Sequence, residues 1–199
     1  MASADAVADA VAALREGLVV AIPTDTVYGI AVDAFVPGAT ARLFEAKRRP
    51  IDVRLPVLVN DVDQAERLAD VDDRARVLME RFWPGGLTII LPRRTGVDIA
   101  LGNGAGAPTV GVRCPDHTVP RRLCVEVGPL AATSANLHGG PTPATADEVR
   151  ALFADAVAVV VDGGRCQGEP STVVDATGSR PVLVREGSVS WSDVLGVAG

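Results

Sequence analysis

Apolar residues recur every three to four positions in several segments of the chain. Over 4–16, Val7, Val11 and Leu14 fall on one helical face, and Gly17 stands where a glycine commonly ends a helix. Similar patterns, several of them ended by proline, predict further helices. We expect these helices over 39–48, 62–68, 74–82, 118–126 and 145–153.

Short apolar runs bounded by turn residues predict strands between these helices. The run over 18–22 ends at a proline and is typical of a buried strand. The other expected strands are 55–59, 87–91, 109–113, 130–133, 157–161, 172–174 and 182–184. Strands and helices alternate, although the last third is mostly strand. This order predicts an α/β (α+β) fold, with a twisted, mixed open sheet flanked by helices.

One domain is expected to span 1–199, with its core at about 8–188 and a short helical tail over 189–199. Hydrophobic residues make up 48% of the chain and charged residues 22%, as in ordinary soluble domains with a substantial core. The net charge of −6 argues against a surface coated in basic residues for nucleic-acid binding, but it leaves room for one cationic cleft.

Targeting and metal signals are weak in the sequence. No apolar run reaches the roughly 18 residues of a membrane span, and the N-terminus lacks the basic start of a secretory signal. We therefore expect a cytoplasmic protein with no membrane partner. The three cysteines and two histidines show no metal-ligand spacing, so no metal site is predicted. Phosphate-loop, dinucleotide-binding and serine-hydrolase motifs are also missing.

Polar residues gather where the predicted strands end. The segment 23–29 reads P-T-D-T-V-Y-G and follows the first strand with two hydroxyls, a carboxylate and a phenol. Ligands of open α/β sheets bind outside the strand carboxyl ends, which favours a binding role. A polar turn that caps a helix is the alternative.

A cationic segment, K-R-R-P at 47–50, ends the helix expected over 39–48. Lys47 offers a point charge, and Arg48 and Arg49 offer bidentate forks, a combination that suits phosphate groups. Cations at a helix C-terminus also offset the helix dipole, which is the structural alternative.

The remaining polar groups follow or begin later strands. Thr109, Gly111 and Arg113 share one face of a strand, which an edge strand with a wet face would also explain. The segment 134–136 reads S-A-N and suits either phosphate oxygens or a capped turn. Other polar residues of this kind are Thr142, Ser171 and Arg185.

Taken in order, these segments resemble the threonylcarbamoyl-AMP synthase (YrdC-like) family in its short, single-domain form. The matching motifs are P-T-D-T-V-Y-G at 23–29, K-R-R-P at 47–50, L-P-V-L-V at 55–59, W-P-G-G-L-T at 83–88, V-G-V-R-C-P at 110–115, S-A-N at 134–136, S-T-V-V-D at 171–175 and R-E-G at 185–187. Each motif is weak alone, but the ordered set covers about 8–188.

The resemblance implies a fold with a large, concave basic cavity and a nucleotidyltransferase activity. In that family, L-threonine, bicarbonate and ATP give threonylcarbamoyl-AMP and pyrophosphate, with Mg²⁺. Downstream enzymes then transfer the threonylcarbamoyl group to tRNA, as N6-threonylcarbamoyladenosine.

The resemblance also assigns roles to residues of this chain. Lys47 and Arg49 correspond to the family's K-x-R signature and are the expected catalytic pair. The expected threonine-binding residues are Thr26, Arg113, Ala132, Thr133 and Ser171. The expected nucleotide-binding residues are Arg49, Thr109, Ser134, Asn136, Thr142 and Arg185. The chain departs from the family at Val53-Arg54, where Asn-Pro is common, and at Leu58, where a histidine is common.

Two other functions remain open from the sequence. The first is a non-catalytic factor that binds double-stranded RNA, tRNA or the ribosome through the same basic cavity. The acidic pI and the lack of aromatic residues among the cations count against it. The second is the related module of hydrogenase maturation, which belongs to much longer chains with zinc-finger and acylphosphatase segments.

Overall fold

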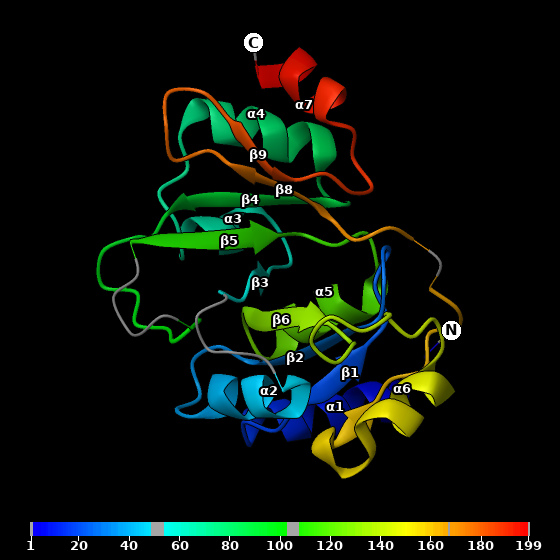
Figure 1. Ribbon diagram of the computed structural model, residues 1–199. Coiled ribbons are helices and arrows are strands. Elements are labelled where there is room, and N and C mark those ends of the chain that lie inside the picture. Colours follow the sequence, from blue (N-terminus) through cyan, green and yellow to red (C-terminus); the bar gives the residue numbers. More distant parts are fainter. Residues whose placement is uncertain (1, 49–53, 103–107, 167, 199) are drawn as a thin grey trace.

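The computed structural model describes residues 2–48, 54–102, 108–166 and 168–198. Within these ranges one twisted sheet runs through the molecule in the strand order β7-β1-β2-β6-β3-β5-β4-β8-β9 (Figure 1). The strands are β1 (Val20–Ile22), β2 (Gly29–Asp33), β3 (Val57–Leu58), β4 (Leu87–Pro92), β5 (Thr109–Arg113), β6 (Leu130–Ser134), β7 (Val159–Val160), β8 (Thr172–Asp175) and β9 (Val182–Arg185). Three neighbouring pairs are parallel (β1/β7, β3/β5 and β4/β8) and the others are antiparallel, so the mixed sheet expected from the sequence is confirmed.

Helices flank the sheet, and several begin at a side chain that accepts a backbone N–H of the first turn. Ser3, Asp61, Asp72 and Thr145 provide such caps, each of which satisfies one amide that the helix leaves unpaired. The helices are α1 (Ala4–Arg15), α2 (Ala39–Lys47), α3 (Val62–Glu66), α4 (Asp73–Phe82), α5 (Thr118–Glu126), α6 (Ala146–Phe153) and α7 (Trp191–Ala198), with a 3₁₀ turn at Ala154–Ala156.

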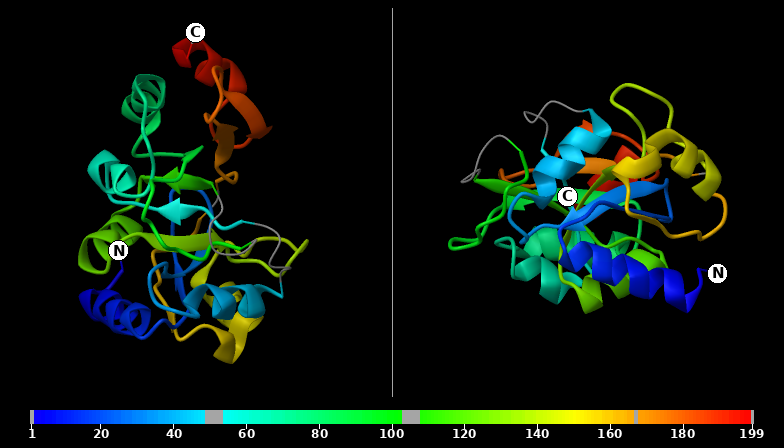
Figure 2. Two further views of the ribbon diagram at one scale, coloured as in Figure 1. Left: turned by 90° about the vertical axis from the view of Figure 1, so that its left-hand side faces the viewer. Right: turned by 90° about the horizontal axis from the view of Figure 1, so that it is seen from below.

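Two hydrophobic clusters hold the layers together. The smaller one joins α1 and α5 to the β1, β2 and β6 part of the sheet, around Leu14, Ile22 and Leu123. The larger one includes Leu43 of α2 and Leu78 of α4, together with the buried hydrophobic residues of β4 and β5. Figure 2 shows α1 and α5 on one side of the sheet and α2 and α6 on the other. The core is built mainly from valine, alanine and leucine, in keeping with the scarcity of aromatic residues.

Strand β2 is not predicted by the sequence, because only three apolar residues separate Gly29 from Asp33. It pairs with β1 on one side and β6 on the other, so tertiary contacts create it. Strand β5 lies between β3 and β4, which makes the edge-strand interpretation of 109–113 wrong. The predicted tail is helical at α7, and among the described residues no helix is long and apolar enough to cross a membrane.

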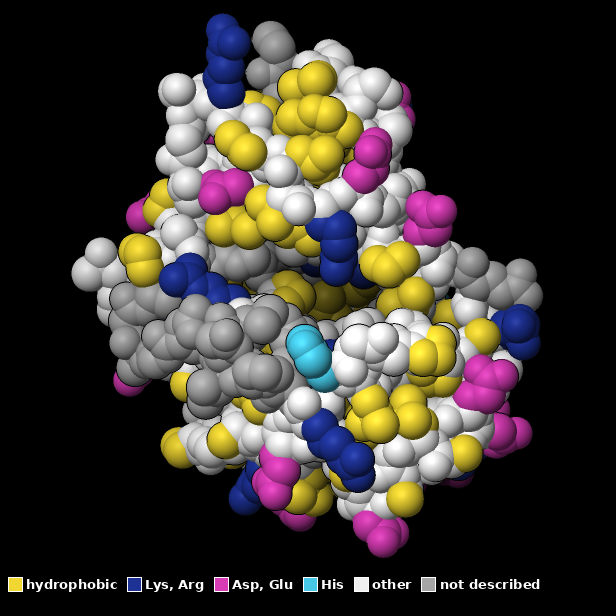
Figure 3. Space-filling model, in the orientation of Figure 1, with side chains coloured by type: hydrophobic (Ala, Val, Ile, Leu, Met, Phe, Trp, Pro, Cys, Tyr) yellow, Lys and Arg dark blue, Asp and Glu magenta, His cyan; other side chains and the backbone are white. Residues whose placement is uncertain are grey.

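The face seen in Figure 3 is hollowed across its middle, with arginine or lysine side chains at its margin. The hollow lies between an upper part, built on β4, β8 and β9, and a lower part, built on β1, β2, β6 and α2 (Figures 1 and 3). Both parts of the molecule therefore border the hollow.

Candidate functional site

The loop between β1 and β2 is held in shape by its own first hydroxyl. Thr24 Oγ1 accepts from the amides of Thr26 and Val27, both at 3.1 Å, and donates to the Val27 carbonyl oxygen at 2.6 Å. The hydroxyls of Thr24 and Thr26 lie 3.0 Å apart, and both residues are buried. This local network fixes the Thr26 side chain in one position.

Arg113, at the end of β5, is buried and contacts three residues in two other segments of the chain. Its Nε donates to the Gly85 carbonyl oxygen at 3.0 Å, Nη1 donates to Thr26 Oγ1 at 2.9 Å, and Nη2 donates to Asp25 Oδ1 at 2.6 Å. Burial lowers the pKa of Arg113, while the neighbouring Asp25 raises it, and a guanidinium remains charged in either case. Two of its five N–H donors have no partner in the described part of the chain, enough for one carboxylate.

Ser171 lies near this cluster, because the amide of the next residue, Thr172, donates to the carbonyl oxygen of Gly86 at 2.9 Å, directly after the Gly85 that Arg113 contacts. Two donors orient Ser171. Thr88 Oγ1 donates to Ser171 Oγ at 2.9 Å, and Arg185 Nη2 donates to the Ser171 carbonyl oxygen at 2.7 Å and to Oγ at 3.3 Å. Because the hydroxyl oxygen already accepts two bonds, its own proton is left to donate. Repulsion from Arg185 also contributes to the lowered pKa of Arg113, after the larger effect of burial.

Lys47, at the end of α2, is buried and bonded to the loop that follows β6. Its Nζ donates to the carbonyl oxygens of Ser134 (2.6 Å) and Asn136 (3.0 Å) and to Asn136 Oδ1 (2.8 Å). The Ser134 hydroxyl donates to the same Oδ1 at 2.6 Å, and Asn136 Nδ2 donates to the Gly140 carbonyl oxygen at 2.7 Å. An ammonium has three N–H donors, and these contacts use donors toward the loop over 134–136. The Lys47 ammonium therefore points at that loop.

Tyr28 connects these two groups of residues. Its carbonyl oxygen accepts from the Ala135 amide at 2.7 Å, and its hydroxyl donates to the Gly164 carbonyl oxygen at 2.8 Å. The segment after Gly164 closes against the same loop, because the Gly168 amide donates to the Thr26 carbonyl oxygen at 2.8 Å. A Cβ on Gly168 would lie 2.6 Å from that oxygen, so this contact requires glycine.

The other predicted site residues have fewer contacts with these groups. Thr109 accepts from Arg54 Nη1, and the Ala132 amide donates to the Pro56 carbonyl oxygen. Thr133 lies next to Ala132 in β6, in register with Ile30. Thr142 is half-buried in the loop between β6 and α6, and no hydrogen bond joins it to the other site residues described.

The remaining positions are a predicted nucleotide-binding residue, Arg49, and two positions where the chain departs from the family pattern, Val53 and Leu58. Arg49 and Val53 lie outside the described residues. Leu58 is buried in the smaller hydrophobic cluster with Val119 and Leu123 of α5, so leucine at this position serves packing.

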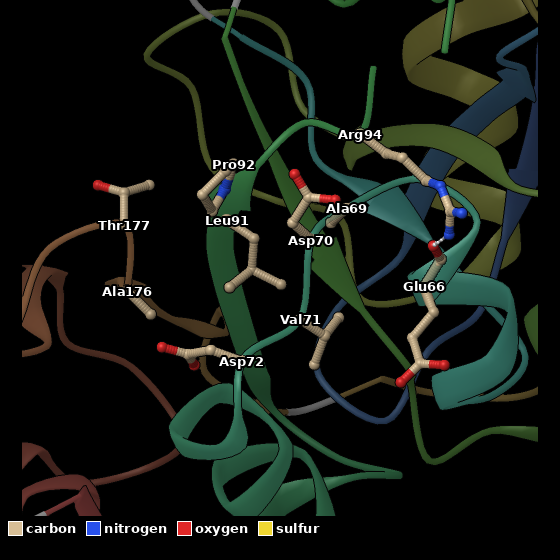
Figure 4. A pocket seen from close by; sticks show the side chains of 10 residues that line it. All are labelled: Glu66, Ala69, Asp70, Val71, Asp72, Leu91, Pro92, Arg94, Ala176 and Thr177. Atoms are coloured by element: carbon tan, nitrogen blue, oxygen red, sulfur yellow. Dashed lines mark hydrogen bonds between the residues drawn. The ribbon is translucent and has the colours of Figure 1, made fainter. Parts of the chain in front are cut away.

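A separate cavity lies away from the predicted site residues. It has a volume of about 430 Å³ and lies by the last residues of β4 and the segment that follows β8 (Figure 4). It is lined by carboxylates such as Asp70 and Asp72, together with Arg94 and apolar residues. The predicted site residues do not line it. Within the described ranges, no group of three or more histidine, cysteine, aspartate or glutamate residues could hold a metal ion.

Sequence reasoning assigned no role to Asp25, Thr88 or Tyr28. All three lie in motifs that resemble the family; Asp25 directly precedes the assigned Thr26, and Tyr28 lies two positions after it. The pairing of Thr88 with Ser171 joins residues 83 positions apart and has no local sequence signal.

Comparison with known proteins gives consistent matches over most of the chain. The model of the Sua5/YciO/YrdC family, described as "Telomere recombination", matches residues 12–187. A threonylcarbamoyl-AMP synthase of Bacillus subtilis is 41% identical over 196 residues, which are 97% of this chain and 56% of the relative. A threonylcarbamoyl-AMP synthase of Chromohalobacter salexigens is 36% identical over 182 residues, which are 87% of this chain and 94% of the relative.

A solved structure extends the likeness to three dimensions. Pyrococcus abyssi Sua5 complexed with L-threonine matches with a TM-score of 0.91 and 38% identity, over 97% of this chain and 57% of that chain. The chain thus spans little more than half of the Bacillus and Pyrococcus relatives and nearly all of the Chromohalobacter one. On the family match and on these identities, the chain belongs to the Sua5/YciO/YrdC family.

Proposed function

We propose that this protein is a threonylcarbamoyl-AMP synthase. The reaction joins L-threonine, bicarbonate and ATP into threonylcarbamoyl-AMP, with release of pyrophosphate and water. The observation that carries the proposal is the convergence of Thr26, Arg113 and Ser171 from distant parts of the chain. Arg113 donates to Thr26 Oγ1 and to the Gly85 carbonyl oxygen, and the residue after Ser171 bonds the adjacent Gly86 carbonyl oxygen. The names of the relatives and the threonine complex of Pyrococcus abyssi Sua5 support the same activity.

The threonine end of the site follows from its donors. Arg113 has N–H donors left for the substrate carboxylate, and the proton of the Ser171 hydroxyl is left for a substrate oxygen. Thr26, fixed by its own loop, lies against Arg113 and is suited to the substrate hydroxyl. A site of this kind rejects alanine more strongly than serine, because alanine leaves buried polar groups unpaired.

The reaction requires that the protein position its substrates, and it needs no nucleophile from the protein. The threonine ammonium first gives up one proton to solvent. The neutral amine nitrogen then forms a bond to CO₂, which arises from bicarbonate by loss of hydroxide, and the proton that the nitrogen loses on becoming a carbamate leaves with that hydroxide as water. A carbamate oxygen then attacks the α-phosphorus of ATP, and the bond from that phosphorus to the bridging oxygen of pyrophosphate breaks. Holding a short-lived carbamate in line with the α-phosphate makes this step effectively unimolecular.

Charge on the phosphate oxygens would be stabilised by the cations and donors around the hollow. Arg185 lies next to Ser171, and Arg49 remains a predicted contact. The structure favours an indirect role for Lys47, since its ammonium shapes the Ser134–Asn136 loop that would face the nucleotide. Mg²⁺ would enter as part of the Mg–ATP substrate, because this ion usually binds phosphate and water oxygens with few protein ligands.

Omission of single substrates tests the proposal. Purified protein is mixed with Mg–ATP, bicarbonate and L-threonine, and pyrophosphate release is measured. We expect release only when all three substrates are present. Release that does not depend on threonine, or no release from the complete mixture, would contradict the proposed function.

A further inference from the structure

The threonine end of the site presents several hydrogen-bond donors and two cations. Arg113 and Arg185 are cationic donors, and the proton of Ser171 is left to donate. An amino acid brings a carboxylate, which these groups suit, and also a positively charged α-ammonium, which they repel. An amino-acid site of this composition therefore needs an acceptor for the α-amino group.

Asp25 is the carboxylate that contacts this cluster. Its Oδ1 accepts from Arg113 Nη2 at 2.6 Å, and the described part of the chain gives its Oδ2 no hydrogen bond. The side chain is 17% exposed, so it is mostly desolvated but still reachable by a small molecule. A carboxylate oxygen in such a position interacts more strongly with an ammonium than it would in water.

The neighbouring contacts hold Asp25 in place. Thr24 bonds the amides of Thr26 and Val27, and the Gly168 amide bonds the Thr26 carbonyl oxygen. The loop that carries Asp25 is therefore braced on both sides of this residue.

We propose that Asp25 binds the α-amino group of the amino-acid substrate, while Arg113 binds its α-carboxylate. The inference rests on the proposed function and deepens it. In one amino acid the ammonium and the carboxylate sit on the same carbon, and Asp25 and Arg113 present the complementary charges side by side. The pair thus recognises the zwitterion, and Thr26 and Ser171 are left to recognise the rest of the substrate.

The variant Asp25→Asn separates amine binding from positioning of Arg113. Asparagine retains a carbonyl oxygen that accepts from Arg113 Nη2, but it replaces the other carboxylate oxygen with an NH₂ donor. The contact to Arg113 persists, and the acceptor for the ammonium is lost. Asp116→Asn is the matched control, since it removes the same charge from an exposed residue near the site without a hydrogen bond to Arg113.

Binding of two ligands to each variant is measured by NMR titration. The first ligand is L-threonine, and the second is (R)-3-hydroxybutanoate, which has the same carboxylate and hydroxyl but no amino group. For Asp25→Asn we expect the Kd of L-threonine to rise at least about tenfold, as for loss of a charged hydrogen bond. The Kd of the deaminated ligand should stay the same or fall, because this anion then meets one carboxylate fewer. Asp116→Asn should leave both Kd values within about twofold.

Each result is decisive. Equal weakening of both ligands by Asp25→Asn, in a protein that is still folded by circular dichroism, would show that Asp25 only positions Arg113. Unchanged threonine binding would exclude any role in recognition. If the wild-type protein itself bound no L-threonine, the proposed function would fail, which is a different outcome from the failure of the Asp25 assignment.

Discussion

The ammonium of Lys47 offers a sharp test, because two roles for it predict opposite effects on stability. If Lys47 were a phosphate-binding cation among other cations, their mutual repulsion would destabilise the protein without substrate. Its removal would then leave the free energy of unfolding unchanged or higher. In the structure, Lys47 is 2% exposed and donates to two carbonyl oxygens and a side-chain oxygen. The substitution Lys47→Met keeps the length of the side chain and removes those donors.

The expected loss of stability follows from these contacts. A buried acceptor without a donor costs about 1–3 kcal/mol, and the loss of a desolvated ammonium offsets part of the total. We therefore expect Lys47→Met to lower the free energy of unfolding by about 2–3 kcal/mol. For a chain of this length, that corresponds to a fall in Tm of about 4–12 °C.

Thermal unfolding without substrate measures this effect, and pyrophosphate release measures activity on the same samples at a temperature where the variant is folded. Arg48→Met is the matched control, because Arg48 is an exposed cation one residue further along. We expect it to leave Tm within about 2 °C. We expect Lys47→Met to lose nearly all activity, since the Ser134–Asn136 loop would no longer be held. A Tm equal to or above that of wild type would refute the indirect role of Lys47.

Three further predictions concern neighbouring side chains. Thr88→Val removes the donor that orients Ser171, so the KM for threonine should rise about tenfold with a smaller change in kcat; an unchanged KM in steady-state kinetics would contradict this. Tyr28→Phe removes the hydroxyl that bonds the Gly164 carbonyl oxygen and should lower the free energy of unfolding by about 1–2 kcal/mol in urea titrations, whereas no change would show that this bond contributes nothing. Burial lowers the pKa of His117, whose Nδ1 accepts a backbone amide at the start of α5, so the unfolded chain takes up the proton first and stability is lost as the pH falls below about 6.5. His117→Asn retains an acceptor but does not titrate, so the fall in Tm between about pH 7.5 and 5.5 should be smaller than in wild type, and an equal fall would contradict the assignment.

Much of the fold could be predicted from the sequence because local patterns determine it. The helices with clear apolar faces and capping residues begin and end within a few residues of the predicted positions, as α1 and α4 show. Strand β2 could not be predicted in this way. Its apolar run is short, and its conformation depends on β1 and β6, which flank it in the sheet.

Only part of the candidate site could be predicted from the sequence. Motif resemblance singled out Thr26, Arg113 and Ser171, and the structure brings them together: Arg113 bonds Thr26 and Gly85, and the strand that follows Ser171 bonds Gly86. The contacts of Asp25 and Thr88 depend on which strands and loops meet in three dimensions, so no spacing in the sequence indicates them.

In the proposed reaction, the carbamate formed from bound threonine attacks ATP, and the threonine carboxylate does not. The direct measurement uses ¹³C-bicarbonate with unlabelled L-threonine and Mg–ATP, followed by mass spectrometry of the adenylate formed. We expect threonylcarbamoyl-AMP that carries one ¹³C atom from bicarbonate. An unlabelled threonyl-adenylate, formed through the amino-acid carboxylate, would contradict it.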